Sequence, residues 1–199
     1  MAPLSSPRRR GLALLLGAGV AVALPRLARA TAVAGTQLSR PQIAPLPALA
    51  LTAMTGEART LDRALANEAP LVLNFVFTTC STTCSLQTAV LAQLQRDWLA
   101  RGRALQLASI TIDPDNDTPE QLRRFAASFR IAPGWQFYTG RFDDLLRVQK
   151  HFDVYRGSKA AHPPVLLLRR RAGAPWLRVE GFPAAADIAA LLETLPAAA

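Results

Sequence analysis

The stretch LVLNFVFTTCSTTC, residues 71–84, decides the fold of this chain. Its first seven residues are almost wholly apolar and β-prone, which is typical of a strand covered on both faces. Helical spacing follows and ends at Gly102. The residues expected to line one face of that helix are Leu86, Val90, Leu94 and Trp98. Cys80 and Cys84 are therefore predicted to lie between the carboxyl end of a buried strand and the opening of a helix, where ligand sites of α/β sheets lie.

Segments of strand and helix character alternate from Ala48 to the end of the chain. We expect a hairpin over Leu49–Leu61, a strand over Leu105–Ile112, a helix from Thr118, a helix over Phe142–Phe152, strands over Val165–Leu168 and Leu177–Val179, and a closing helix over Ile188–Leu195. Thr118 before Pro119 is a strong helix start, with a capping hydroxyl followed by proline at the first helical position. This order predicts an α/β fold of the thioredoxin-like type, with a mixed central sheet covered by helices on both faces.

The amino-terminal residues predict three consecutive regions. Residues 1–30 have the layout of an export signal: arginines up to Arg10, an apolar run, and then Ala28-Arg29-Ala30 as a cleavage signature. The apolar run of 14 residues is shorter than the ~20 that span a bilayer. We therefore expect cleavage after Ala30, a linker over 31–47 and one folded domain over 48–199, located in the periplasm. An uncleaved membrane anchor is the alternative, and a role at the membrane depends on it.

The formal net charge of +9 does not indicate nucleic-acid binding, because of where the charges lie. Residues 1–30 hold five arginines and no acid, so the rest of the chain has 18 basic and 14 acidic residues. Apart from Arg169-Arg170-Arg171 these basic residues are scattered. A solvated surface is the expected role of this charge, and no nucleic-acid partner is predicted.

Cys80 and Cys84 admit three chemical interpretations. A structural disulfide would close a loop of five residues, so its stabilisation would be small. A thiol–disulfide oxidoreductase usually has Cys-x-x-Cys, one residue shorter than the spacing here. Metal binding requires at least one further ligand. In each case we expect both sulfurs on one face of the first helical turn, where the helix amino terminus lowers thiol pKa values below ~8.5.

The chain has two histidines that could complete a metal site. His151 follows Lys150 near the end of a predicted helix, where interaction with the helix terminus explains it. His162 precedes Pro163-Pro164 and a strand, in the loop that faces the cysteine turn in thioredoxin folds. Two thiolates and one imidazole suit copper, since thiolate is soft enough for Cu(I) and imidazole accommodates Cu(II). Zinc accepts the same donors and stays open on chemistry alone.

Four motifs together resemble the SCO/SenC family of copper metallochaperones, over about Leu71 to Leu168. They are Asn74-Phe75 before the Cys-x-x-x-Cys pair, Ser109-Ile110-Thr111-Ile112-Asp113-Pro114 with Asp117-Thr118-Pro119-Glu120, the run Gly134-Trp135-Gln136-Phe137-Tyr138-Thr139-Gly140, and His162 before an apolar strand. Asp113 is interpreted as a local turn cap before Pro114.

The resemblance implies a thioredoxin-like fold and one copper ion, Cu(I) or Cu(II), bound by Cys80, Cys84 and His162. It also implies help in assembling cytochrome c oxidase, so the expected partner is the copper-site subunit of that oxidase or another periplasmic copper or thiol protein. The resemblance thus implies a metallochaperone rather than an enzyme. The alternative is a thiol–disulfide oxidoreductase that uses Cys80 and Cys84 as its redox pair. A peroxiredoxin is disfavoured, because no proline lies between Leu71 and Cys84.

Overall fold

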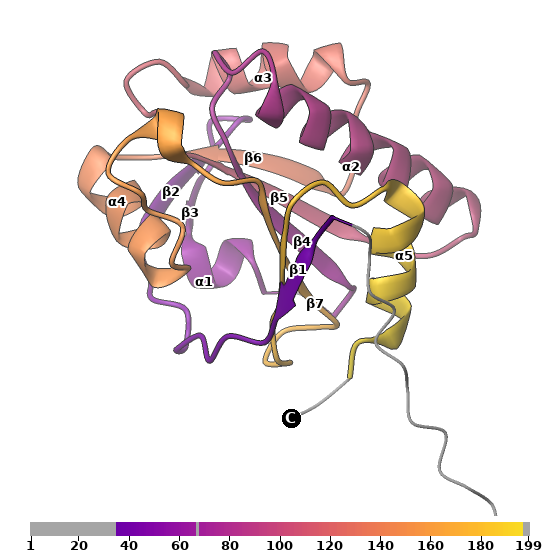
Figure 1. Ribbon diagram of the computed structural model, residues 1–199. Helices are drawn as coiled ribbons and strands as arrows, with labels where there is room; N and C mark the ends of the chain where they lie inside the picture. The colour runs from indigo at the N-terminus through magenta and orange to yellow at the C-terminus, as the bar shows by residue number, and fades with distance from the viewer. Residues whose placement is uncertain (1–34, 67, 197–199) are drawn as a thin grey trace, which may run out of the picture. The chain divides into compact units, whose positions relative to one another are not determined.

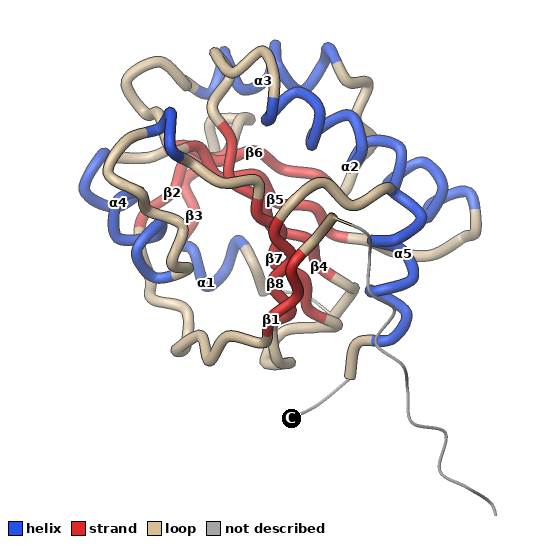
Figure 2. Tube along the Cα trace, viewed as in Figure 1, coloured by secondary structure: helices blue, strands red, loops and turns tan. Residues whose placement is uncertain are grey.

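The computed structural model describes residues 35–66 and 68–196, and within them eight strands form one mixed sheet (Figure 2). The strands are β1 Gln37–Ser39, β2 Ala50–Ala53, β3 Ala58–Thr60, β4 Leu71–Val76, β5 Gln106–Thr111, β6 Trp135–Thr139, β7 Val165–Arg169 and β8 Leu177–Glu180. Their order across the sheet is β1-β8-β7-β4-β5-β6-β2-β3. The expected hairpin is present as the antiparallel pair β2 and β3.

Helices cover both faces of the sheet, as the sequence predicted (Figure 1). They are α1 Leu61–Ala64, α2 Thr83–Ala100, α3 Pro119–Ser128, α4 Phe142–His151 and α5 Ala185–Thr194, together with the short 3₁₀ turn η1 at Lys159–Ala161. One core cluster lies between the sheet and α2, α3 and α5. A second cluster lies between the opposite face and α1 and α4.

Strand β4 organises the edge of the sheet that carries the cysteines. All six of its residues are buried, which explains why every residue except Asn74 is apolar. It runs parallel to β5, which in turn runs parallel to β6, so the carboxyl ends of these three strands meet at one edge. Its other neighbour, β7, is antiparallel and pairs Asn74 with Leu166. The residues just before β7 therefore lie at the edge where β4 ends, and His162 is among them.

Helix α2 differs from the prediction in the face that it buries. Leu86, expected in the core, is 53% exposed. The buried face carries Leu91, Leu94 and Trp98, and also the polar Gln87, Thr88 and Gln95. Gln87 accepts a hydrogen bond from Asn74 of β4, and Gln95 donates to the Ala132 carbonyl. The Thr88 hydroxyl donates to the Cys84 carbonyl within the same helix. The prediction is therefore confirmed for Leu94 and Trp98 and wrong for Leu86, and apolar spacing did not identify the polar residues of the buried face.

The start of α3 agrees with the prediction, whereas β1, β6 and α1 were not predicted. The predicted start of α3 is confirmed, because the Thr118 hydroxyl accepts a hydrogen bond from the backbone N–H of Gln121. Strand β6 and the short helix α1 were not predicted as elements. Within the segment expected to be a linker, Gln37–Ser39 forms β1 and pairs with β8.

The predicted signal, residues 1–30, lies outside the described residues. Of the helices within 35–66 and 68–196, none has both the length and the hydropathy that a bilayer crossing requires.

Candidate metal and thiol site

The two cysteines lie beside each other at the carboxyl end of β4, as the sequence predicted, but only Cys84 is helical. Cys80 lies in the turn before α2, where its backbone N–H donates to the Phe77 carbonyl. Its Sγ accepts a hydrogen bond from the backbone N–H of Cys84 at 3.5 Å. The sulfur thus satisfies one of the N–H groups that a helix leaves without an internal partner at its amino terminus. Within the described residues both cysteines are free thiols.

Hydrogen bonds make Cys80 the more acidic thiol. Burial alone would raise the pKa of Cys80, but the side chain is half-buried and this effect is outweighed. The backbone N–H groups of Cys84 and Thr82 and the Thr82 hydroxyl stabilise the thiolate, so the pKa of Cys80 lies below its ordinary value of 9.0. A partly accessible sulfur with stabilised negative charge is the reactive member of the pair.

Cys84 has the opposite electrostatics, which corrects the expectation that both thiols would be acidic. It is 3% exposed. Burial raises the pKa of Cys84 to about 12, and the neighbouring Cys80 sulfur and the Asp117 carboxylate add to the increase. The helix terminus does not compensate, because the Cys84 N–H points at the Cys80 sulfur. A bound cation would remove this penalty, since a metal-bound thiol loses its proton.

A buried carboxylate, Asp117, holds the start of the cysteine loop in place. It accepts hydrogen bonds from the backbone N–H and hydroxyl of Thr78, two residues before Cys80, and from the hydroxyl of Thr111 at the end of β5. Burial raises the pKa of Asp117, and these hydrogen bonds oppose that effect. Sequence reasoning missed this role. The signal was available, because Thr78 and Asp117 follow adjacent parallel strands and such strands end at the same edge.

His162 lies at the same edge of the sheet, with its ring packed against β4. Its ring meets Phe75 edge-on, with the ring centroids 6.2 Å apart. Both ring nitrogens are buried, and neither has a hydrogen-bond partner among the described residues. Burial lowers the pKa of His162, while the backbone of Val154 and Phe75 acts in the opposite direction. The imidazole is therefore neutral at pH 7, the form in which histidine binds metals.

A salt bridge fastens the loop that carries His162. Lys159 Nζ, three residues before His162, contacts Asp113 Oδ2 at 2.6 Å. Asp113 is 6% exposed, and it also accepts hydrogen bonds from the Asn116 amide. The expected turn-capping role of Asp113 is thus present, and the contact with Lys159 is an addition that sequence reasoning did not find. His162, Asp113 and Lys159 line a hollow of about 260 Å³ that neither cysteine lines.

The structure brings the two cysteines together but does not complete a three-ligand cluster. Within the described ranges, no three His, Cys, Asp or Glu side chains lie close enough to hold a metal ion. Two soft sulfur donors and an imidazole whose buried nitrogens lack partners fit copper in donor chemistry. Cys80, Cys84 and His162 would act together only after the His162 loop moves toward the cysteines.

His151 is separate from this edge and stays a helix-end residue. It is the last residue of α4, and its ring packs edge-on against Phe152. Burial lowers the pKa of His151, with a smaller opposing effect from the backbone of Ala44. Its place in α4 makes it a matched control for experiments on His162.

Parts of the sequence are similar to a known family and to a curated protein. The family model described as SCO1/SenC matches residues 47–166. A curated relative from Bacillus subtilis (strain 168), named SCO1 protein homolog, is 38% identical over 68 residues, which are 34% of this chain and 35% of the relative. The aligned stretch thus spans about a third of that relative's length.

Solved structures share the fold at low sequence identity. A SCO1/SenC family lipoprotein from Bacillus anthracis is 24% identical, with a TM-score of 0.66 over 80% of this chain and 99% of the other. Arabidopsis thaliana ScoI with copper bound is 18% identical, with a TM-score of 0.64 over 75% and 97%. BsSco, described with a disulfide switch and as a member of the Sco family of cytochrome c oxidase assembly proteins, is 23% identical, with a TM-score of 0.63 over 77% and 94%.

These structural likenesses confirm the thioredoxin-like fold. The family model covers more than half of the chain, and the Cys-x-x-x-Cys pair and His162 both lie inside the matched range. The protein belongs to the SCO1/SenC family.

Proposed function

We propose that this protein binds one copper ion through Cys80, Cys84 and His162 and delivers it to the copper centre of cytochrome c oxidase. Copper is the cargo, and the three side chains release it to a partner protein. The partner is the copper-site subunit of the oxidase, or another periplasmic copper or thiol protein. The proposed location is the periplasm, which the signal-like residues 1–30 and the lipoprotein description of one relative support.

The observation that carries the proposal is that two free thiols and a buried imidazole, whose ring nitrogens have no hydrogen-bond partner among the described residues, lie at the same edge of the sheet. The Cys80 sulfur accepts the Cys84 N–H, so both sulfurs lie within one turn of the chain. Both nitrogens of His162 are buried without partners in the part of the chain that the structure describes. An unsatisfied buried polar group costs about 1–3 kcal/mol, which coordination of a metal would recover.

Movement of the His162 loop is part of the proposal. The ring leaves Phe75, and the loop is restrained chiefly by the contact between Lys159 and Asp113. The Lys159 side chain is half-exposed, so water can solvate its ammonium group when the contact opens, while the Asn116 amide stays bonded to Asp113. A cargo site that opens at low cost suits a carrier, because the metal must leave as well as bind.

Copper titration of single variants tests this ligand set. The protein is reduced, titrated with Cu(I) in competition with a chromophoric chelator, and compared with Cys80→Ala, Cys84→Ala and His162→Ala. Each variant is expected to bind copper at least about tenfold more weakly, because each loses one donor atom. His151→Ala is the matched control and is expected to bind as the wild type does. Equal affinity of the His162→Ala and wild-type proteins would contradict the ligand set.

A second function, thiol–disulfide exchange, is favoured by the difference in exposure between the cysteines. Cys80 is half-buried, whereas Cys84 is 3% exposed. Cys80 would attack a partner disulfide, forming a mixed disulfide and releasing one partner thiolate. Cys84, after losing its proton, would attack the Cys80 sulfur and release the second thiolate. The two protein thiols lose two electrons and two protons, and the partner disulfide gains them.

The two functions differ in their need for His162. Reduction of a model disulfide requires both cysteines but no imidazole. Unchanged reduction of that disulfide by His162→Ala, without any dependence on copper, would favour the exchange function. Copper loading requires reduced thiols, so one protein can perform both steps.

A further inference from the structure

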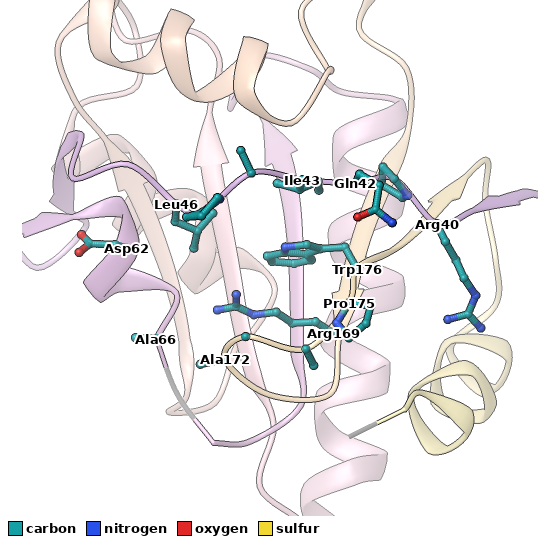
Figure 3. A pocket seen from close by; sticks show the side chains of 15 residues that line it. Arg40, Gln42, Ile43, Leu46, Asp62, Ala66, Arg169, Ala172, Pro175 and Trp176 are labelled. Atoms are coloured by element: carbon teal, nitrogen blue, oxygen red, sulfur yellow. The ribbon is translucent and has the colours of Figure 1, made fainter. Parts of the chain in front are cut away.

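A second pocket, of about 660 Å³, lies far from the cysteines and ends at a buried arginine (Figure 3). The segment 40–46, helix α1, the end of β7 and the turn before β8 line it. Arg169 of β7 pairs with Leu71 at the amino end of β4, whereas the cysteines follow the carboxyl end of that strand. Six residues of strand separate the two ends by roughly 20 Å. This pocket is therefore distinct from the metal and thiol site.

Arg169 is a buried cation without an anionic partner among the residues that the structure describes. Its side chain is buried, with a residue exposure of 4%. Within the described residues, Arg169 donates one hydrogen bond, from Nη2 to the Leu65 carbonyl. Its Nε is buried there without an acceptor. The guanidinium lies over the ring of Trp176, 4.5 Å from the centroid. Burial lowers the pKa of Arg169 to about 10, which still leaves it charged at neutral pH.

Asp62, the acidic residue in the pocket lining, does not neutralise the charge of Arg169. Asp62 also lines the pocket, yet Figure 3 shows its carboxylate turned away from the guanidinium. No carboxylate of the described residues forms an ion pair with Arg169, whereas the nearby Arg171 pairs with Glu68. Burying a charge is unfavourable unless it is paired, so an uncompensated guanidinium attracts an anion.

The rest of the lining indicates what kind of anion fits. Ile43, Leu46 and Trp176 give the pocket apolar walls (Figure 3). A planar guanidinium with free N–H donors matches a carboxylate, which accepts from it along one edge. Arg40 also lines the pocket, but Figure 3 shows its guanidinium directed away from that of Arg169. One cation beside apolar walls suits a singly charged ligand with an apolar body better than a doubly charged phosphate.

We propose that this pocket binds a small organic carboxylate, with the carboxylate on Arg169 and the apolar body against Trp176 and Ile43. The site is independent of copper, because it lies at the opposite end of β4. It gives the protein a second ligand whose binding stabilises the fold by linkage.

A pair of matched ligands tests the proposal on the unmodified protein. Phenylacetate and its neutral amide, phenylacetamide, share one body and differ in charge. Calorimetry measures each affinity, and the indole N–H signal of Trp176 in an NMR spectrum reports the place of binding. Phenylacetate is expected to bind saturably and at least about tenfold more tightly than the amide, because it alone makes charge-assisted hydrogen bonds. Equal affinities, or no saturable binding of phenylacetate, would overturn the proposal.

Two variants then assign the charge to one residue. Arg169→Met keeps the length and apolar stem of the side chain, and it is expected to lose the preference for phenylacetate over the amide. Arg170→Met is the matched control: this neighbour contacts the Leu192 carbonyl and does not line the pocket, so the preference is expected to persist. An unchanged preference in Arg169→Met would refute the role of the guanidinium. The wild-type comparison decides the question even where a variant folds poorly.

Discussion

The two cysteines are expected to differ in reactivity by about three orders of magnitude, and single-cysteine variants measure the difference. Cys84→Ser leaves Cys80, and Cys80→Ser leaves Cys84. Only the thiolate reacts with an alkylating reagent, so the rate follows the ionised fraction. The Cys80 sulfur accepts the N–H at position 84, which the serine variant retains. The buried position of Cys84 is unchanged in Cys80→Ser.

The magnitude follows from the two pKa values. A thiol with the ordinary pKa of 9.0 is about one-tenth ionised at pH 8, and Cys80 exceeds this because its pKa lies lower. Cys84, with a pKa of about 12, is ionised to about one part in ten thousand at that pH. Loss of the Cys80 sulfur removes a part of the effect on Cys84, but burial is its largest cause and remains.

Iodoacetamide modification, followed by mass spectrometry between pH 6 and about 9.5, is the assay. The rate for Cys80 should rise with pH and begin to level off within this range, whereas the rate for Cys84 should still rise about tenfold per pH unit at the top of the range. Unfolding the variants in denaturant should bring the two rates together. Rates within tenfold of each other in the folded variants would refute the electrostatic account of the pair.

Three further predictions concern the supports of the site. Asp117→Ala leaves the N–H and hydroxyl of Thr78 and the hydroxyl of Thr111 without their acceptor, and should lower the free energy of unfolding by about 3 kcal/mol in urea titrations. A loss below about 1 kcal/mol would show that Asp117 does not support the cysteine loop. Thr118→Ala removes the cap of α3 and should lower the free energy of unfolding, measured by thermal denaturation, by about 1 kcal/mol. No change in that free energy would show that the cap is redundant. Lys159→Met frees the His162 loop from Asp113 and should speed copper uptake about two- to fivefold in stopped-flow mixing, and slower uptake would contradict the proposed loop movement.

Sequence patterns predicted the central elements because their chemistry is local. The continuous apolar run of β4 and the Thr-Pro start of α3 each carry their signal within a few residues. Strand β6 was missed because its residues, buried at four of five positions, lack the alternation that identifies a strand. The buried face of α2 was predicted only in part, because buried Gln87 and Gln95 are stabilised by partners distant in sequence, which apolar periodicity does not detect.

The site was predicted in its residues more than in its arrangement. The position of the cysteine pair follows from the order of strand and helix, so it was predictable. Their unequal acidity was not, because it depends on how deeply each sulfur is buried. The contacts of Lys159 with Asp113 and of His162 with Phe75 join segments far apart in the chain. No spacing rule encodes such contacts, and they determine where the imidazole rests.

The most direct test of the account is X-ray absorption at the copper edge of the copper-loaded protein, with His162→Ala beside it. Copper bound by Cys80, Cys84 and His162 should show two sulfur scatterers and one imidazole nitrogen, at distances of roughly 2.0–2.3 Å. The imidazole signal should vanish in His162→Ala and persist in His151→Ala. An imidazole signal that survives in His162→Ala, or a wild-type spectrum with fewer than two sulfurs, would contradict the convergence of these three side chains on one ion.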